Sequence, residues 1–158
     1  MQKIFISSFC VLFEDYDLLE QLCKSCPEVP MGTELGTSWP IPNFDELLDS
    51  QVPRFASGPV TLHAPFVEIS GAPDSPERAA MDAAFAKAFR WYHLFGAESM
   101  VMHTHERAVP ADERAQLQEW SLEAIRSVAA RAKAEGLHLT APLPPRSAVP
   151  CTLRTAID

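Results

Sequence analysis

Short apolar runs alternate with longer amphipathic stretches along this chain of 158 residues, and this order restricts the possible folds more than any other feature. Runs of about four to eight β-branched, aromatic and aliphatic residues are typical of buried strands. Strands that alternate with helices usually pair in parallel through right-handed crossovers, so the sequence predicts an α/β fold. The strands are expected at residues 3–9, 31–36, 60–67, 100–103 and 137–140.

The helices between these runs have recognisable start and stop signals. Ser75 and Pro76 form an N-cap followed by a first-turn proline, and apolar residues then recur at helical spacing until Gly96. This pattern predicts a long amphipathic helix that packs on the sheet. Other helices are expected after residue 15, within residues 40–53 where Pro53 closes the pattern, and over residues 110–135.

The residues that follow the first strand separate two α/β architectures. A dinucleotide-binding doubly wound sheet would carry a glycine-rich phosphate loop at this point, but Ser7, Ser8, Phe9 and Cys10 are found instead. The sequence therefore favours a partial (β/α)8 TIM barrel, with about five parallel strands and their intervening helices, over residues 1–140.

The last part of the chain, residues 141–158, has a different composition. It contains Pro142, Pro144, Pro145 and Pro150, and neither a helical nor a strand period continues. It is predicted to be an irregular proline-rich tail. A complete barrel of this type needs about 250 residues, and the abrupt start of the tail inside a strand suggests the hypothesis of a frameshifted or truncated end.

Charge and cysteine content limit the possible partners and location. The formal net charge of -8 disfavours nonspecific binding to nucleic acid or to anionic membranes. No apolar run approaches the length of a membrane span, and the first run lacks a signal-peptide cleavage site. Four cysteines are too few for a disulfide scaffold, so a cytoplasmic location is expected. The Cys23–Cys26 pair lies at the end of a predicted helix, where the dipole disfavours a reactive thiolate.

Polar residues occur near the ends of three predicted strands. The second strand is expected to end through Glu34, the third through His63 and the fourth through His103, with His105 two residues further on. Because the carboxyl ends of parallel barrel strands meet on one face, these side chains are expected to converge. A carboxylate and two or three imidazoles suit a divalent metal. Each histidine taken alone is more often a hydrogen-bonded structural residue than a ligand.

These three segments resemble the xylose isomerase-like TIM-barrel superfamily, which includes sugar phosphate isomerases and epimerases and the endonuclease IV type of repair enzyme. The motifs are Gly-Thr-Glu-Leu-Gly at 32–36, Val-Thr-Leu-His-Ala-Pro-Phe at 60–66 and Ser-Met-Val-Met-His at 99–103. The resemblance covers roughly the predicted barrel part and implies a site at the barrel mouth. There, a divalent metal such as Mn, Mg, Co or Zn assists isomerisation or epimerisation of a sugar or sugar phosphate by proton transfer next to a carbonyl.

The resemblance also implies roles for individual residues. His63, His103 and His105 would be metal ligands, and Glu34 and His63 would contact the substrate. The family's main metal-binding glutamate at the end of the fifth strand has no counterpart, because Ala141, Pro142 and Leu143 occupy that place. Little or no catalytic activity is therefore expected from the chain as it stands.

Two alternative functions follow from the same features. The first is a noncatalytic half-barrel, whose open strand edges and uncovered apolar face would favour a homo-oligomer or a partner protein. The second is a metal-dependent phosphodiesterase of the endonuclease IV type, although the acidic charge argues against a basic groove for a nucleic acid backbone. Phe9, Trp39 and Phe66 lie near strand ends and either wall a substrate pocket or pack in the core, and general burial tendencies favour the core.

Overall fold

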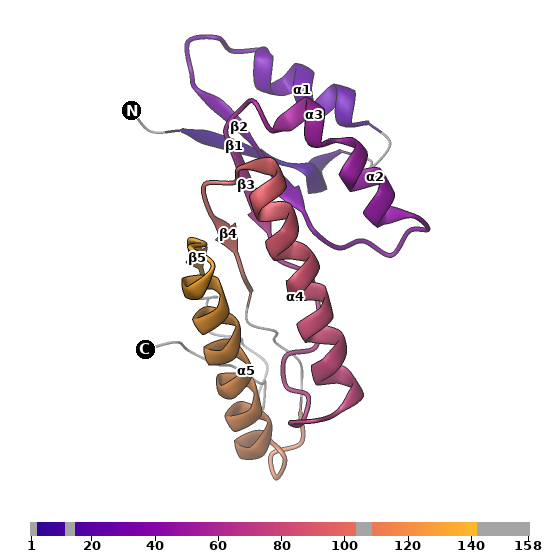
Figure 1. The fold of residues 1–158 in the computed structure, drawn as a ribbon, viewed down its shortest axis with the longest axis vertical. Coiled ribbons are helices and arrows are strands. Elements are labelled where there is room, and N and C mark those ends of the chain that lie inside the picture. The colour runs from indigo at the N-terminus through magenta and orange to yellow at the C-terminus, as the bar shows by residue number, and fades with distance from the viewer. Residues whose placement is uncertain (1–2, 12–14, 104–108, 142–158) are drawn as a thin grey trace.

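The computed structural model describes residues 3–11, 15–103 and 109–141, so that His105 and the proline-rich tail lie outside the described residues. Strands and helices alternate along the described chain (Figure 1). The strands are β1 (Ile4–Ser7), β2 (Met31–Gly36), β3 (Val60–His63), β4 (Met100–Val101) and β5 (Leu139–Thr140). The helices are a 3-10 turn η1 (Ser8–Cys10), α1 (Tyr16–Lys24), α2 (Phe44–Ser50), α3 (Val52–Phe55), α4 (Pro76–Phe95) and α5 (Arg114–Ala134).

The five strands form one parallel sheet in the order β1-β2-β3-β4-β5, with each strand paired to the next along the chain. A doubly wound sheet would reverse its strand order at a switch point. The sequential order found here is that of a (β/α)8 barrel, so the predicted α/β class and partial barrel are confirmed.

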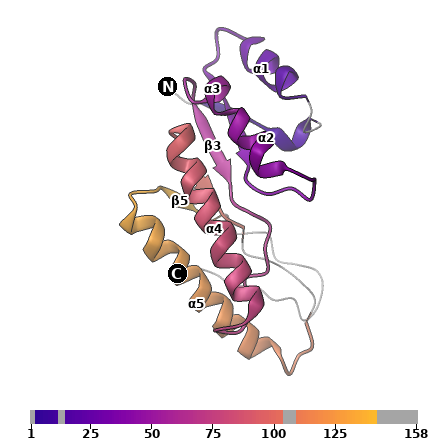
Figure 2. The ribbon, with the colours of Figure 1, turned by 45° about the vertical axis from the view of Figure 1, so that its right-hand side comes forward.

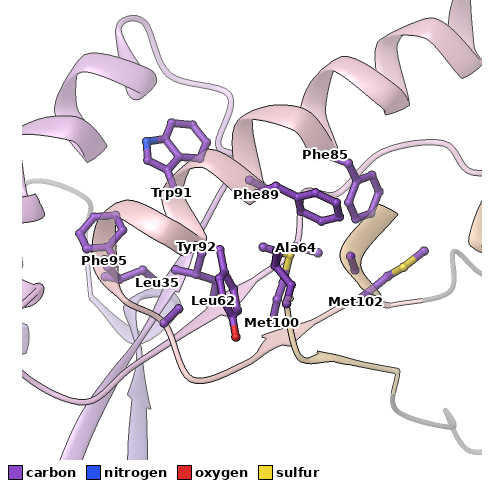
Figure 3. Packing of buried hydrophobic residues seen from close by; sticks show 14 of the residues in the cluster. Leu35, Leu62, Ala64, Phe85, Phe89, Trp91, Tyr92, Phe95, Met100 and Met102 are labelled. Carbon is purple, nitrogen blue, oxygen red and sulfur yellow. The ribbon is translucent and has the colours of Figure 1, made fainter. Parts of the chain in front are cut away.

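The main hydrophobic core lies between one face of the sheet and the helices. In Figure 3, residues of α4 such as Phe85 and Phe89 pack over Leu62 and Met100 of the sheet. Leu62 and Met100 have no exposed surface, and Phe85 and Phe89 are 1% exposed. Figure 2 shows α4 and α5 lying side by side along this face. The apolar face of α4 therefore covers the strands, as its amphipathic sequence pattern predicts.

The opposite face of the sheet, the concave inner face of the barrel segment, is mostly polar. Side chains alternate along a strand, and residues paired in register share a face. By this rule the inner face carries Phe5, Ser7, Gly32, Glu34, Gly36, Thr61, His63, Val101 and Thr140. The expectation of an uncovered apolar face stays a prediction: five of these nine inner-face residues are polar, and the apolar member of each alternating pair points mainly toward the helices.

The ends of α4 agree with the sequence, whereas several other boundaries differ. The Ser75 side chain accepts a hydrogen bond from the backbone N–H of Arg78 at 3.2 Å, and Gly96 ends the helix with φ of 60°. Pro53 does not close the preceding helix but lies in the first turn of α3, where a missing N–H has no cost. The third strand ends at His63 rather than residue 67, because Pro65 cannot donate to a ladder.

The described cysteines and helices test two further predictions. Cys10, Cys23 and Cys26 are free, and the thiol of Cys23 lies 3.3 Å from the Gly32 carbonyl oxygen and 3.4 Å from the Thr33 hydroxyl. Cys23 thus packs locally between α1 and β2. Among the helices that the structure describes, none combines the length and the hydropathy needed to cross a bilayer.

Candidate functional site

The ends of β3 and β4 bring His63 and His103 together. His63 is the last residue of β3 and is 7% exposed, whereas His103 follows β4 by two residues and is exposed. Their rings stack with centroids 4.8 Å apart and an interplanar angle of 22°. Two of the predicted site residues therefore meet at the carboxyl ends of adjacent strands, which we call the mouth of the barrel segment.

One hydrogen bond determines the tautomer of His63. Its ring Nδ1 lies 2.9 Å from the carbonyl oxygen of Ala64. A carbonyl can only accept, so a neutral His63 carries its proton on Nδ1 and a lone pair on Nε2. The Nε2 atom is thereby available as a proton acceptor or a metal ligand.

Glu34 lies within β2 rather than at its end. It is paired in register with Ser7 and Thr61, while Gly36 is paired with His63, so Glu34 is one inner-face step deeper than the histidine. The charge of its carboxylate still affects the pKa of His103 at the mouth. Although His103 is exposed, the desolvation of the part of its ring that packs against neighbours lowers its pKa below the ordinary 6.5. The charge of His63 lowers it further, whereas the negative charge of Glu34 opposes this shift.

The described residues alone do not complete a metal site. They include no group of three His, Cys, Asp or Glu side chains that could hold an ion. Metal binding by His63, His103 and His105 stays a prediction, because the position of His105 is not described.

Aromatic rings form a wall beside the histidine pair. The centroid of Phe9 lies 5.1 Å from His63, 5.6 Å from Phe66 and 5.5 Å from Trp39. Phe66 in turn lies 4.7 Å from His63. Trp39 is 39% exposed and Phe66 is 60% exposed. The preference for core packing is therefore wrong for these two rings, which are held at the surface of the mouth.

Gly36 explains how this wall is accommodated. A Cβ atom at Gly36 would lie 2.7 Å from the ring of Phe9, so the ring can lie over β2 only because that position has no side chain. Hydrogen bonds fix the neighbouring loops: Ser38 Oγ accepts from the backbone N–H of Phe66 at 3.0 Å, and Thr37 Oγ1 donates to the carbonyl of His63 at 2.8 Å. Gly36 is thus a sequence signal for the position of Phe9 but not for the exposure of Trp39 and Phe66.

Solved structures share this fold. The TTHB071 protein from Thermus thermophilus, soaked with zinc chloride, is 20% identical, with a TM-score of 0.63 over 89% of this chain and 55% of that one. A D-tagatose 3-epimerase-like protein is 14% identical, with a TM-score of 0.66 over 94% of this chain and 55% of that one. The partial barrel fold is thus confirmed, and the chain spans about 55% of the length of each of these proteins.

Other comparisons add less. Endonuclease IV from Thermus thermophilus is 15% identical over 80% of this chain and 46% of its own, and its TM-score of 0.41 is too low to show a common fold. No protein-family model matches the sequence. A search of curated proteins also found no match.

Proposed function

We propose that the mouth binds a sugar or sugar phosphate and supports isomerisation or epimerisation by proton transfer next to a carbonyl. The observation that carries this proposal is the stacked His63–His103 pair beside a partly exposed aromatic wall. Imidazoles transfer protons near neutral pH, and aromatic faces pack against the apolar C–H face of a sugar ring. Similarity of fold to a D-tagatose 3-epimerase-like protein supports the same substrate class.

The proton transfers can be assigned to groups at the mouth. Nε2 of His63 accepts the proton from the carbon next to the substrate carbonyl. The carbonyl oxygen then takes up a proton, giving an enediol, and the reverse steps on the other carbon or face complete the reaction. His103 is the second imidazole within reach, and Glu34 accepts a hydrogen bond from a substrate hydroxyl. Phe9, Trp39 and Phe66 exclude water from one side.

Hydrogen exchange provides a direct test. D-tagatose or D-fructose is incubated with the protein in D2O, and loss of the proton signals next to the carbonyl is followed by NMR. We expect slow exchange that falls at least about tenfold in His63→Gln, a loss typical of removing a general base. His138→Gln is the matched control, because His138 lies at the opposite end of the sheet, before β5. Equal exchange in His63→Gln and wild type would contradict the proposal.

The predicted divalent metal is tested separately. Thermal unfolding is measured with Mn, Mg, Co or Zn, since any ion that binds the folded state raises its stability. A rise in the midpoint that disappears in a His63→Ala, His103→Ala double variant would support these residues as ligands. A rise that persists in the double variant would place the ion elsewhere.

The alternative of a noncatalytic half-barrel is also supported by a specific feature. A groove of about 610 Å³ runs along β5 and α5 and is lined partly by Ala129, Ala132, Leu137 and Leu139. The outer edge of β5 has no neighbouring strand among the described residues. Such an edge can pair with another chain, including a second copy. Light scattering of wild type and Leu139→Lys tests this: a dimer that the substitution converts to a monomer would support it.

A further inference from the structure

A second groove lies beside the mouth, between the segment that follows β2 and the N-terminal half of α4. Its volume is about 630 Å³, and small-molecule sites commonly occupy roughly 300–1,000 Å³. Ala80, Ala83 and Ala84 of α4 line one side. Their short side chains leave the space open. The other side consists mainly of residues 37–46.

Trp39 belongs both to this groove and to the mouth. It lines the groove, and with Ser38, Pro40 and Phe66 it also lines a recess on the side of the mouth. Its ring lies 5.5 Å from that of Phe9, which contacts His63. A ligand that begins at the mouth can therefore continue past the exposed indole into the groove.

The charges in the groove disfavour an anionic ligand. The ammonium group of Lys87 lies 2.5 Å from the Asp45 carboxylate, so this positive charge already has a partner. Glu46 adds a second carboxylate to the lining. A phosphate or carboxylate on the ligand would meet like charge here. A neutral polar ligand meets no such penalty.

Asn43 offers hydrogen bonds in the same groove. It is exposed and adopts φ of 57° and ψ of 29°, a left-handed conformation that asparagine tolerates better than most residues. Its side chain makes no capping hydrogen bond to α2. The amide can both donate and accept, as recognition of vicinal hydroxyl groups requires.

We propose that this groove holds the second sugar unit of a neutral disaccharide or glycoside whose first unit lies at the mouth. The inference rests on the proposed function, because the mouth must take the first sugar. Trp39 stacks between the two units, Asn43 binds hydroxyl groups of the second, and the alanine side of α4 leaves room for it. The preferred substrate is then a glycosylated ketose without a phosphate on its second unit.

The test compares binding of D-fructose with that of three glycosylated fructoses, namely turanose, lactulose and palatinose, by isothermal titration calorimetry. Ala83→Leu fills the groove. Ala86→Leu is the matched control, because Ala86 is exposed on the same helix but does not line the groove. Circular dichroism checks that each variant is folded.

We expect at least one disaccharide to bind wild type roughly tenfold more tightly than fructose, an advantage equivalent to about 1.4 kcal/mol. Ala83→Leu should remove this advantage and leave fructose binding unchanged, while Ala86→Leu changes neither. The inference is overturned if no disaccharide binds more tightly than fructose, or if Ala83→Leu leaves the advantage intact. If fructose alone does not bind but an Ala83-dependent disaccharide does, the groove site stands and the function proposed for the mouth fails.

Discussion

Gly32 of β2 should be among the least replaceable residues of the sheet. A Cβ atom there would lie 2.6 Å from the carbonyl oxygen of Pro59 and 2.6 Å from the ring of Phe5. The ring can turn away, but the Pro59 carbonyl accepts a hydrogen bond from the backbone N–H of Thr33 at 3.0 Å. Relief of the clash therefore requires that β2 and β3 move apart.

The expected cost follows from these two contacts. Overpacking of a tightly packed site costs about 1–3 kcal/mol, and weakening one backbone hydrogen bond costs about 0.5–1.5 kcal/mol. Gly32→Ala should therefore lower the free energy of unfolding by roughly 2–4 kcal/mol, a large part of the roughly 5–15 kcal/mol typical of a domain.

Urea denaturation followed by circular dichroism measures this change, with two glycine controls. Gly58 is exposed and would place its Cβ no closer than 3.8 Å to another atom, so Gly58→Ala should stay within about 0.5 kcal/mol of wild type. Gly96 has open space but φ of 60°, so Gly96→Ala should cost about 1–2 kcal/mol for conformation alone. A Gly32→Ala variant as stable as Gly58→Ala would refute the argument from close packing.

Three further predictions concern the mouth and the packing of the helices. Gly36→Ala should displace the flexible ring of Phe9 rather than backbone, so sugar binding should weaken about tenfold or more while the urea midpoint changes little. Asp49→Ala should destabilise the chain by about 1–3 kcal/mol in urea denaturation, and Asp49→Asn by less, because the buried indole N–H of Trp91 donates to Asp49 Oδ1 at 2.7 Å. The imidazole of His103 should titrate below pH 6.5 by NMR, mainly because part of its ring is desolvated. As the pH falls, the unfolded chain therefore binds the proton before the folded chain does. The stability that this lowered His103 pKa contributes is present above pH 6.5 and is lost as the pH falls toward the lower folded pKa. A His103 pKa above 6.5 would contradict this prediction.

The sequence was sufficient to predict the fold because local signals and chain order agreed. Ser75 and Gly96 delimit α4 as expected, and the parallel order of the strands follows from their alternation with helices. The boundaries near prolines were less predictable. Pro53 fits either the end of one helix or the first turn of the next, and only packing selects between them.

The site was predicted in part. The meeting of His63 with His103 followed from their positions at adjacent strand ends. The depth of Glu34 within β2 could not be predicted in this way, because a shift of two residues along a strand leaves a side chain on the same face. The exposed wall of Trp39 and Phe66 was also missed, since aromatic residues are usually buried and nothing local marks these two as exceptions.

The outer face of the sheet packs against the helices and stabilises the fold, whereas the inner face carries residues of the proposed site. Leu62 and Met100 are fully buried on the outer face, and they alternate with the inner-face residues Thr61, His63 and Val101. The helices therefore hold β3 and β4, and with them the histidine pair, through contacts that ligands do not touch. An outer-face change such as Leu62→Ala should cost about 2–5 kcal/mol and disturb the mouth together with the fold. An inner-face change such as His63→Gln should alter hydrogen exchange in the substrate with little effect on the urea midpoint. If both variants instead lost stability equally, His63 would be a structural residue and the mouth would need another proton acceptor.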